Sequence, residues 1–401
     1  MMKPSVRLPL EGLRILAVSQ FGAGPYATMV LADLGADVVK IEDPRSGGDV
    51  SRSVPPYQIP GDSIYFQSFN RNKRSITLDL RTPEGRALFH RLVAVSHAVF
   101  NNLRGDETHK LGLDYESLRE INPRVVCCSL SGFGRSGARA HEPGYDYLIQ
   151  AATGYMSMTG DPAGPPVSCG VSVIDYASGL AAALGLVAAV SAARETGQGS
   201  DVEVSLYDVA ISMLTYLGAW NLNRGFEPTR RSGSAHQTLV PAQTFRTADG
   251  HIVLFCAKEK FWRKLCEALG APEMAGREGF RNFGERYESR DAVIETIQSI
   301  LATKTTEEWI TRFQGQVPCA PVRDLTSALS DPFTHEREMI VETDHPEFGK
   351  VRQVAGPVKI PGAKKSHHRA PKLGEHTEEI LKDWLGLSAE EIAEMNGKGE
   401  V

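Results

Sequence analysis

The chain has 401 residues, more than one hydrophobic core of usual size accommodates, so its length predicts two domains. Hydrophobic residues make up 41% of the sequence and charged residues 23%, which excludes a disordered chain and is typical of an α/β enzyme. The formal net charge of −5 gives no global attraction for nucleic acid or an anionic membrane, so we expect neither as a partner. An anionic ligand must therefore meet locally placed cations.

The sequence also argues against a secreted, membrane-spanning or metal-binding protein. We find no apolar run near the roughly 20 residues that cross a bilayer, and the first ten residues lack the apolar centre of a signal peptide. The six cysteines form no Cys-x-x-Cys pair and no metal-like pattern with histidine, so we expect reduced thiols and no metal site. These features predict a cytoplasmic protein.

Strands and helices alternate through the first 220 residues. Apolar, β-prone segments predict strands at 13–18, 37–41, 98–101, 125–129 and 201–205. Periodic segments predict helices at 26–34, 83–95, 115–121, 145–156 and 174–193, and one more that ends near Leu217. This order is typical of βαβ units and predicts the α/β class with a parallel sheet.

The amino-acid composition changes at 223–236, where a connector rich in Gly, Arg and Ser predicts a hinge. We therefore expect a large domain at 1–222, a smaller α+β domain at 223–330 and a C-terminal segment at 331–401. The small domain is predicted to hold a strand at 251–256 and helices at 260–269, 290–302 and 306–313. The C-terminal segment is predicted to end in helices at 375–385 and 388–395.

The first strand is followed by a glycine motif, Gly22-x-Gly24-x-x-Ala27, with Glu42 twenty residues on. This is the pattern of dinucleotide-binding loops, in which glycines let the backbone approach a pyrophosphate. The same features suit another phosphate-bearing ligand, or a tight turn that packs a helix on a sheet. The motif alone leaves all three interpretations open.

A set of short segments, in order along nearly the whole chain, resembles the class III CoA-transferases, the family of formyl-CoA transferase and carnitine CoA-transferase. The matching segments are Leu10-Glu11-Gly12-Leu13, Ala23-Gly24-Pro25, Leu34-Gly35-Ala36-Asp37, Asn70-Arg71-Asn72-Lys73-Arg74-Ser75, Asn102-Leu103-Arg104, Ser131-Gly132-Phe133-Gly134, Gly144-Tyr145-Asp146, Asp175 with Gly179, Thr196-Gly197-Gln198-Gly199 and Leu373-Gly374-Glu375-His376. The resemblance implies a Rossmann-like large domain formed by both chain ends, a smaller α+β domain, and two subunits interlocked as a homodimer.

The resemblance also assigns a nucleophile. Asp175 matches the family's aspartate, whose carboxylate attacks a thioester to form an acyl anhydride and then an enzyme thioester with CoA. An Asp near a helix start is otherwise most often a cap. The expected substrates are an acyl-CoA, with succinyl-CoA or another short dicarboxyl-CoA as donor, and a carboxylic acid. No permanently bound cofactor is expected.

CoA carries phosphates, so the site needs cations and close backbone approach. The predicted CoA-binding residues are Lys73 and Asn102, which match a CoA-contacting lysine and a pantetheine-side asparagine of the family, together with Lys40, Arg74, Arg104 and Gly24. Arg71 and Arg74 have the alternative of being solvated charges. His236, near Gly233, either covers the acyl group or is a surface histidine of the hinge.

Tyr145 separates two members of this superfamily. The related α-methylacyl-CoA racemases resemble this chain but carry a histidine there, which works with the later aspartate as an acid/base pair. A tyrosine, with a pKa near 10, is a poor substitute. A CoA-transferase is therefore the first hypothesis and a racemase the second. From other classes, an NAD-dependent oxidoreductase and a non-catalytic CoA-binding protein remain open.

Overall fold

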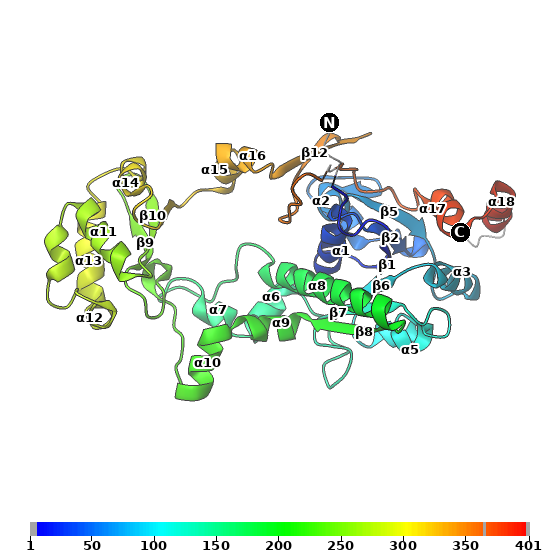
Figure 1. Ribbon diagram of the computed structural model, residues 1–401, viewed down its shortest axis with the longest axis horizontal. Helices are drawn as coiled ribbons and strands as arrows, with labels where there is room; N and C mark the ends of the chain where they lie inside the picture. The colour runs from blue at the N-terminus through cyan, green and yellow to red at the C-terminus, as the bar shows by residue number, and fades with distance from the viewer. Residues whose placement is uncertain (1–5, 364–365, 398–401) are drawn as a thin grey trace. The chain divides into compact units, whose positions relative to one another are not determined.

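The computed structural model describes residues 6–363 and 366–397 (Figure 1). Contacts between residues divide the chain into two compact units. The first unit holds Met1–Thr153, Gly170–Thr215 and Pro332–Val401, and the second holds Gly154–Cys169 and Tyr216–Asp331. The segment Gly154–Cys169, which the sequence analysis left in the large domain, belongs to the second unit because Arg230 donates hydrogen bonds to the carbonyl oxygens of Asp161 and Gly164 there.

A six-stranded parallel sheet forms the centre of the first unit. Its order is β5-β2-β1-β6-β7-β8, with bounds β1 Arg14–Val18, β2 Asp37–Glu42, β5 Lys73–Thr77, β6 Ala98–Asn101, β7 Val126–Ser131 and β8 Ser200–Ser205. Leu16 of β1 stands opposite Val39 of β2 and Val99 of β6, and all three are fully buried. Such near-continuous apolar strands are typical of a parallel sheet that is covered on both faces.

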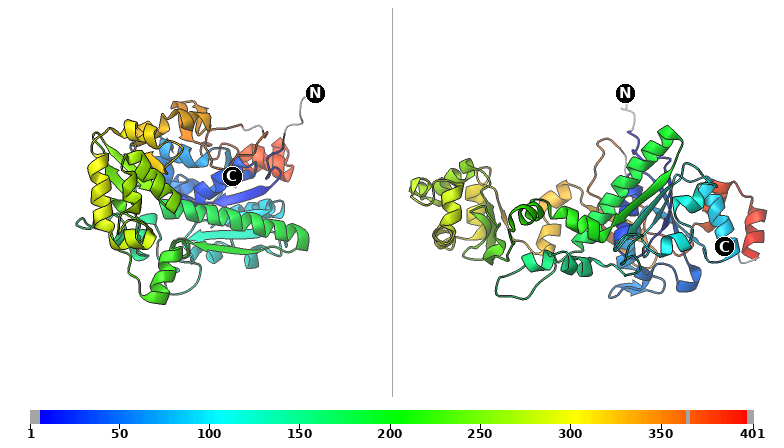
Figure 2. Two further views of the ribbon diagram at one scale, coloured as in Figure 1. Left: turned by 60° about the vertical axis from the view of Figure 1, so that its left-hand side comes forward. Right: turned by 90° about the horizontal axis from the view of Figure 1, so that it is seen from below.

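Helices pack against this sheet. The long α8 (Val173–Thr196) packs along α1 (Ala23–Asp33) and against β7 and β8 (Figure 2). Leu88 and Phe89 of α3 (Pro83–Ala94) share a buried cluster with Ile380 and Trp384 of α17 (Thr377–Leu385), which contacts β5 (Figure 1). Elements from opposite ends of the chain therefore build one core.

Short elements complete the first unit. They are η1 Pro44–Ser46, η2 Val50–Ser53, β3 Gln58–Ile59, β4 Asp62–Ser63, α2 Ile64–Asn70, α4 Glu107–Lys110, α5 Tyr115–Leu118, α6 Asp146–Ala152, α9 Leu206–Met213, α16 Pro332–Glu336, β12 Ile340–His345, β13 Gly349–Val354 and α18 Ala389–Gly397.

The second unit is a three-stranded antiparallel sheet with helices, ordered β11-β10-β9. Its elements are α7 Tyr155–Met158, α10 Thr215–Arg224, η3 Ser232–Ser234, β9 Ala242–Arg246, β10 His251–Phe255, α11 Glu259–Leu269, η4 Pro272–Gly276, α12 Phe283–Glu288, α13 Arg290–Leu301, α14 Thr306–Phe313, β11 Cys319–Pro321 and α15 Leu325–Leu329. Trp262, Trp309 and Phe280 are buried in its own core, so this unit has a hydrophobic core separate from that of the sheet.

Most of the predicted elements are confirmed, and the differences have local causes. The helix expected at 145–156 is broken into α6 and α7 at Gly154, whose φ of +88° ends the helical path. Thr215, with φ of +43°, separates α9 from α10. By length and composition α8 is apolar enough to cross a bilayer, contrary to the expectation that no run approaches that length. Its packing on α1, β7 and β8 buries part of this apolar surface, and Leu184 on the same helix remains exposed.

Candidate functional site

Two helices begin close together where the sequence indicated a nucleophile. Helix α1 starts directly after β1 with Gly22 as its N-cap residue, and Asp175 lies in the first turn of α8. A Cβ at Gly22 would lie only 2.8 Å from Asp175 Oδ2. The carboxylate therefore rests directly against the backbone of Gly22, and a side chain at that position would occupy its space.

The Asp175 carboxylate has an unusual electrostatic setting. Within residues 6–363 and 366–397 no hydrogen-bond donor or cation contacts it. Burial and then the negative charge of Asp146 raise the pKa of Asp175 to about 7. The partial positive charge at the start of α1 acts in the opposite direction. The result is a carboxylate that is ionised in a large fraction of molecules near neutral pH and is unpaired.

Asp146, the first residue of α6, holds the start of α8. Its Oδ2 accepts backbone N–H groups from Ile174 at 2.7 Å and from Asp175 at 3.1 Å. Asp146 is only 3% exposed, and Gln150 donates to its Oδ1. The sequence analysis named Asp146 only within a family segment. Asp146 caps α8 through a tertiary contact between residues 28 apart in the sequence, and no local sequence pattern predicts such a contact.

Aromatic side chains gather near Asp175. The Tyr65 hydroxyl lies 3.9 Å from the position of a Cβ at Gly22, on the same side as Asp175 Oδ2. Phe21 contacts Tyr65, with ring centroids 5.3 Å apart, and meets Tyr145 edge to face at 6.3 Å. Burial, reinforced by the charges of Tyr176 and Asp175, raises the pKa of Tyr65, so its hydroxyl stays protonated as a potential donor. An acyl group that reaches Asp175 would therefore contact aromatic surface and phenol groups.

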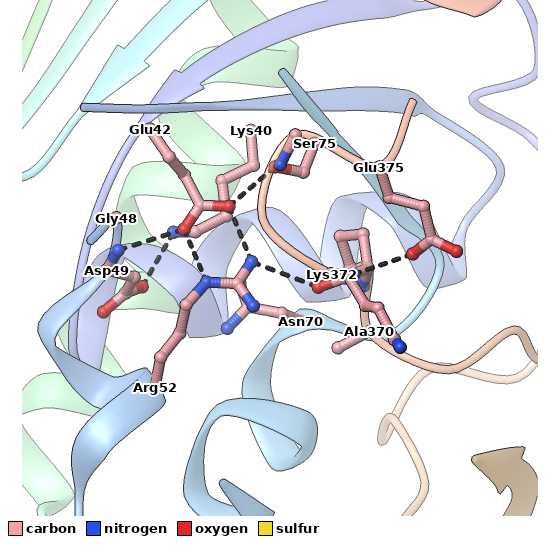
Figure 3. A network of polar contacts seen from close by, with 12 residues as sticks. Lys40, Glu42, Gly48, Asp49, Arg52, Asn70, Ser75, Ala370, Lys372 and Glu375 are labelled. Carbon is pink, nitrogen blue, oxygen red and sulfur yellow. Dashed lines mark hydrogen bonds and ion pairs between the residues drawn. The ribbon is translucent and has the colours of Figure 1, made fainter. Parts of the chain in front are cut away.

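The turn that carries Phe21 is held by a buried ion pair (Figure 3). Phe21 has a positive φ of +67°, and its N–H donates to Asp49 Oδ1 at 3.0 Å. The other Asp49 oxygen accepts from Lys40 Nζ at 2.7 Å, and both side chains of this pair are fully buried. Lys40, predicted to bind CoA, is thus placed as a support of this turn.

Lys73 and Arg71 are also buried among acceptors of the chain. Lys73 Nζ donates to the carbonyl oxygens of Pro25 at 2.8 Å and Phe69 at 2.9 Å and to Asn70 Oδ1 at 2.8 Å, so all three of its donors are used. Burial holds the pKa of Lys73 well below its usual range. Arg71 is fully buried and pairs with Asp33 at 2.6 Å, which corrects the interpretation of it as a solvated charge.

The remaining predicted cations form ion pairs outside the nucleophile's surroundings. Arg74 of β5 binds Asp37 of β2 at 2.6 Å and reaches Glu379 of α17 at 3.0 Å. Arg104 is 43% exposed at its side chain and pairs with Asp106 at 2.8 Å. Arg74 therefore ties two strands to a C-terminal helix, whereas Arg104 remains at the surface and accessible.

Asn102 and Gly24 fit one another at the start of α1. The Asn102 side chain exchanges two hydrogen bonds of 2.9 Å with the backbone N–H and carbonyl oxygen of Gln20. A Cβ at Gly24 would lie 2.6 Å from Asn102 Cγ, so this glycine makes room for the asparagine. Both predicted residues thus set the path of the loop between β1 and α1.

His236 lies within the second unit. Its Nε2 lies 3.2 Å from the Tyr216 hydroxyl, and its Nδ1 accepts N–H groups from Thr238 and Leu239. Burial and then Arg290 lower the pKa of His236, which favours the neutral ring. The histidine is therefore half-buried and engaged through both ring nitrogens.

A cleft of about 330 Å³ opens at the carboxyl ends of β1, β2 and β5, beside the point where the strand order reverses between β1 and β6. Open α/β sheets bind ligands at this place. Arg81 lines the cleft, and nearby Arg45 pairs with the lining residue Asp79 at 2.8 Å. Both arginines are more than half exposed and were missed by the sequence analysis, although each closely follows the end of a strand.

Glu42, the acid of the dinucleotide pattern, is unavailable to a ribose. It is 3% exposed, and its two oxygens accept hydrogen bonds from Arg52 at 2.7 and 2.9 Å (Figure 3). Ser75 Oγ and the N–H of Asp49 also donate to it. Glu42 is therefore committed to holding β2, β5 and the following loop together.

Comparison with known proteins places this geometry in a family. Residues 10–377 match the family described as CoA-transferase family III. The chain belongs to this family. It is 39% identical over 382 residues to the succinyl-CoA:mesaconate CoA-transferase of Haloarcula hispanica, a match that covers 93% of this chain and 95% of the relative. It is 33% identical to the human succinyl-CoA:glutarate CoA-transferase, covering 98% and 90% of the two chains.

Solved structures agree with this membership. A CAIB/BAIF family protein from Brucella suis is similar in structure with a TM-score of 0.81 and 33% identity, covering 94% of this chain and all of the other. This family III CoA-transferase is therefore an enzyme that transfers CoA. The two relatives described above are named for succinyl-CoA and a second dicarboxylic acid. Since the chain is a CoA-transferase and Glu42 is buried and paired with Arg52, we no longer interpret the glycine motif as a nicotinamide site.

Proposed function

We propose that this enzyme transfers CoA from succinyl-CoA to a second dicarboxylic acid, with Asp175 as the nucleophile. The observation that carries the proposal is the unpaired Asp175 carboxylate, which lies against Gly22 with a pKa raised to about 7 by burial and by Asp146. The names of the relatives at 39% and 33% identity favour succinyl-CoA as the donor.

The first half of the reaction transfers CoA from the donor to Asp175. An oxygen of Asp175 attacks the thioester carbonyl carbon, the carbon–sulfur bond breaks, and CoA leaves as a thiolate. The product is a mixed anhydride between Asp175 and the donor acyl group. The thiolate then attacks Cγ of Asp175 and displaces succinate, which leaves an aspartyl-CoA thioester.

The second half repeats these steps with the acceptor. Its carboxylate attacks Cγ of Asp175 and releases the thiolate again, and the thiolate attacks the acceptor's acyl carbon. This last step forms the new acyl-CoA and restores the Asp175 carboxylate. The thioester energy is retained only where water is excluded, and the rings of Phe21 and Tyr65, which contact one another, supply apolar surface beside Asp175.

The nucleotide end of CoA fits the cleft at the ends of β1, β2 and β5. We assign its phosphates to Arg45 and Arg81, because guanidinium groups bind phosphate and both are exposed beside this cleft. We do not assign this role to Lys40 and Lys73. The ammonium group of Lys40 is fully buried and paired with Asp49, and all three donors of Lys73 are used inside the protein. Arg104 stays a candidate at the surface.

The test combines transfer assays with detection of the adduct. A panel of acyl-CoA donors and free acids, followed by mass spectrometry of Asp175 peptides, should show transfer from succinyl-CoA and CoA bound to Asp175. We expect Asp175→Ala to lower kcat by about 10⁴-fold or more while CoA binding stays within a few-fold. Asp208→Ala, which changes an exposed aspartate in the first turn of α9, is the matched control. Retained turnover in Asp175→Ala would rule out the nucleophile.

We further propose that the enzyme is a homodimer, as the family resemblance implies. Large apolar side chains on α6, α8 and α9 are exposed, including Leu148 at 52%, Leu184 at 73% and Ile211 at 43%. Exposed apolar patches of this kind are typical of interfaces. Light scattering of the wild type against Leu184→Glu would report a loss of dimer, and a monomeric wild type at micromolar concentration would reject the proposal.

A further inference from the structure

The start of α8 is capped by a carboxylate from another helix. Ser172, the N-cap residue of α8, makes no capping hydrogen bond with its side chain. Asp146 instead accepts the N–H groups of Ile174 and Asp175. The free N–H groups of a helix start ordinarily stabilise a carboxylate in the first turn. Asp146 takes these donors and leaves Asp175 without them.

The groups that interact with Asp175 include no cation in the described parts of the chain. They are the phenols of Tyr65 on α2, Tyr176 on α8 and, through Tyr176, Tyr26 on α1, with the carboxylate of Asp146 on α6. The carboxylate of Asp49 acts on Tyr65 and not directly on Asp175, and it is paired with Lys40. Tyr145 adds another phenol beside Phe21. The charged group that acts on the Asp175 carboxylate is thus a second carboxylate, that of Asp146.

We propose that Asp146 is a positioning residue that holds Asp175 as an unpaired, repelled carboxylate and thereby favours its acylation. This inference rests on the proposed function of Asp175 as the nucleophile. Asp146 orients the first turn of α8 through two N–H groups and at the same time opposes the negative charge of Asp175. Asp146 is only 3% exposed, so its side chain acts through Asp175.

The charge changes during the reaction show which step this repulsion favours. When Asp175 forms the anhydride, its negative charge passes to the CoA thiolate, and in the aspartyl-CoA thioester the charge passes to the departing carboxylate. Both enzyme-bound intermediates are neutral at Asp175. Asp146 therefore repels Asp175 before the attack and no longer does so afterwards. The repulsion raises the free energy of the ionised Asp175 and so lowers the barrier to its acylation.

The variant Asp146→Asn separates charge from position. An asparagine keeps a carbonyl oxygen that accepts the N–H groups of Ile174 and Asp175, and Gln150 can present the other end of its amide. We expect kcat/KM of the wild type to fall as pH drops through about 7, the raised pKa of Asp175. In Asp146→Asn this acid limb should move down by about one pH unit or more. Above pH 8 the rate should fall by about tenfold because the nucleophile is less basic.

Two further variants make the test decisive. Asp146→Glu keeps the charge and should keep the acid limb near that of the wild type, even where a longer side chain slows the reaction. Asp114→Asn removes the carboxylate that caps α5 at Ser117 N–H and should leave the profile unchanged. Thermal unfolding of all variants reports folding independently.

The outcomes distinguish this inference from the proposed function. A downward shift in Asp146→Asn alone supports the inference. An unmoved acid limb in Asp146→Asn, with CoA still found on Asp175 by mass spectrometry, overturns the role of Asp146 and leaves the nucleophile standing. The absence of any Asp175 adduct in the wild type overturns both.

Discussion

Buried charges are treated in opposite ways in two regions of the first unit. Around β2 and β5, each buried carboxylate has a cation, as Arg52 binds Glu42 and Lys40 binds Asp49 (Figure 3). At the start of α8, Asp175 has none and faces Asp146. Arg52 and Lys40 outweigh burial and hold the pKa of Glu42 and Asp49 below the usual range, whereas burial and Asp146 raise that of Asp175. The paired carboxylates hold the fold together, whereas Asp175 is left unpaired, as the proposed nucleophile requires.

The largest expected effect comes from breaking a pair. Lys40→Met leaves Asp49 buried without its cation, so we expect the free energy of unfolding to fall by about 3–5 kcal/mol. Urea denaturation measures this change. Lys110→Met, at an exposed lysine that pairs with Asp106, should have no measurable effect. A Lys40→Met protein as stable as the wild type would show that the ion pair is dispensable.

The next effect concerns the room left for the unpaired carboxylate. In Gly22→Ala the new methyl group would lie 2.8 Å from Asp175 Oδ2 and displace it. We expect kcat to fall by about 100-fold, since small misplacements of reacting groups cost this much, while CoA binding is kept. Gly276→Ala, where a Cβ meets nothing within 4 Å, serves as the control. Undiminished turnover in Gly22→Ala would mean that Asp175 reacts from another position.

The smallest expected effect is a gain in stability instead of a loss. It tests directly whether the unpaired charge of Asp175, unlike the paired charges, destabilises the fold. The folded-state pKa of Asp175 is raised, so its ionisation destabilises the fold as pH rises from about 4 to about 7. The shift of about three pKa units corresponds to a penalty of about 4 kcal/mol at pH 8. Asp175→Asn removes the charge but keeps a polar amide in the same partly buried place, so we expect the free energy of unfolding to rise by about half of this, roughly 2 kcal/mol, at pH 8 and not at pH 4. Denaturant titrations at both pH values test this. A gain that is equal at both would point to packing rather than to charge.

Much of the fold followed from the sequence because its strands are short apolar runs between turn residues. The strand at 98–101 was predicted with the bounds that the structure has. Strand β5 was not predicted, because Lys73 and Arg74 interrupt its apolar pattern. Those charges become compatible with a strand only through partners such as Asn70 and Asp37, which lie on other elements.

The candidate site was predictable in part. Asp175 and the glycine loop were identified from the family segments, and the structure brings Gly22 against that carboxylate. The assignment of cations was harder, because residue type does not reveal whether a lysine faces a ligand or a carbonyl oxygen. Lys73 illustrates this, since all its donors are satisfied internally. Asp146 was assigned no role because its contact with α8 exists only in three dimensions.

The covering of β5 by the C-terminal segment bears on biosynthesis. Ser75 of this edge strand bonds with the backbone of Gly374 and His376, and α17 follows at Thr377. A ribosome makes Gly374 299 residues after Ser75, so the nascent polypeptide carries this sheet edge uncovered while the intervening chain is made. The edge is covered only after this segment has emerged, and until then an unpaired strand is open to aggregation.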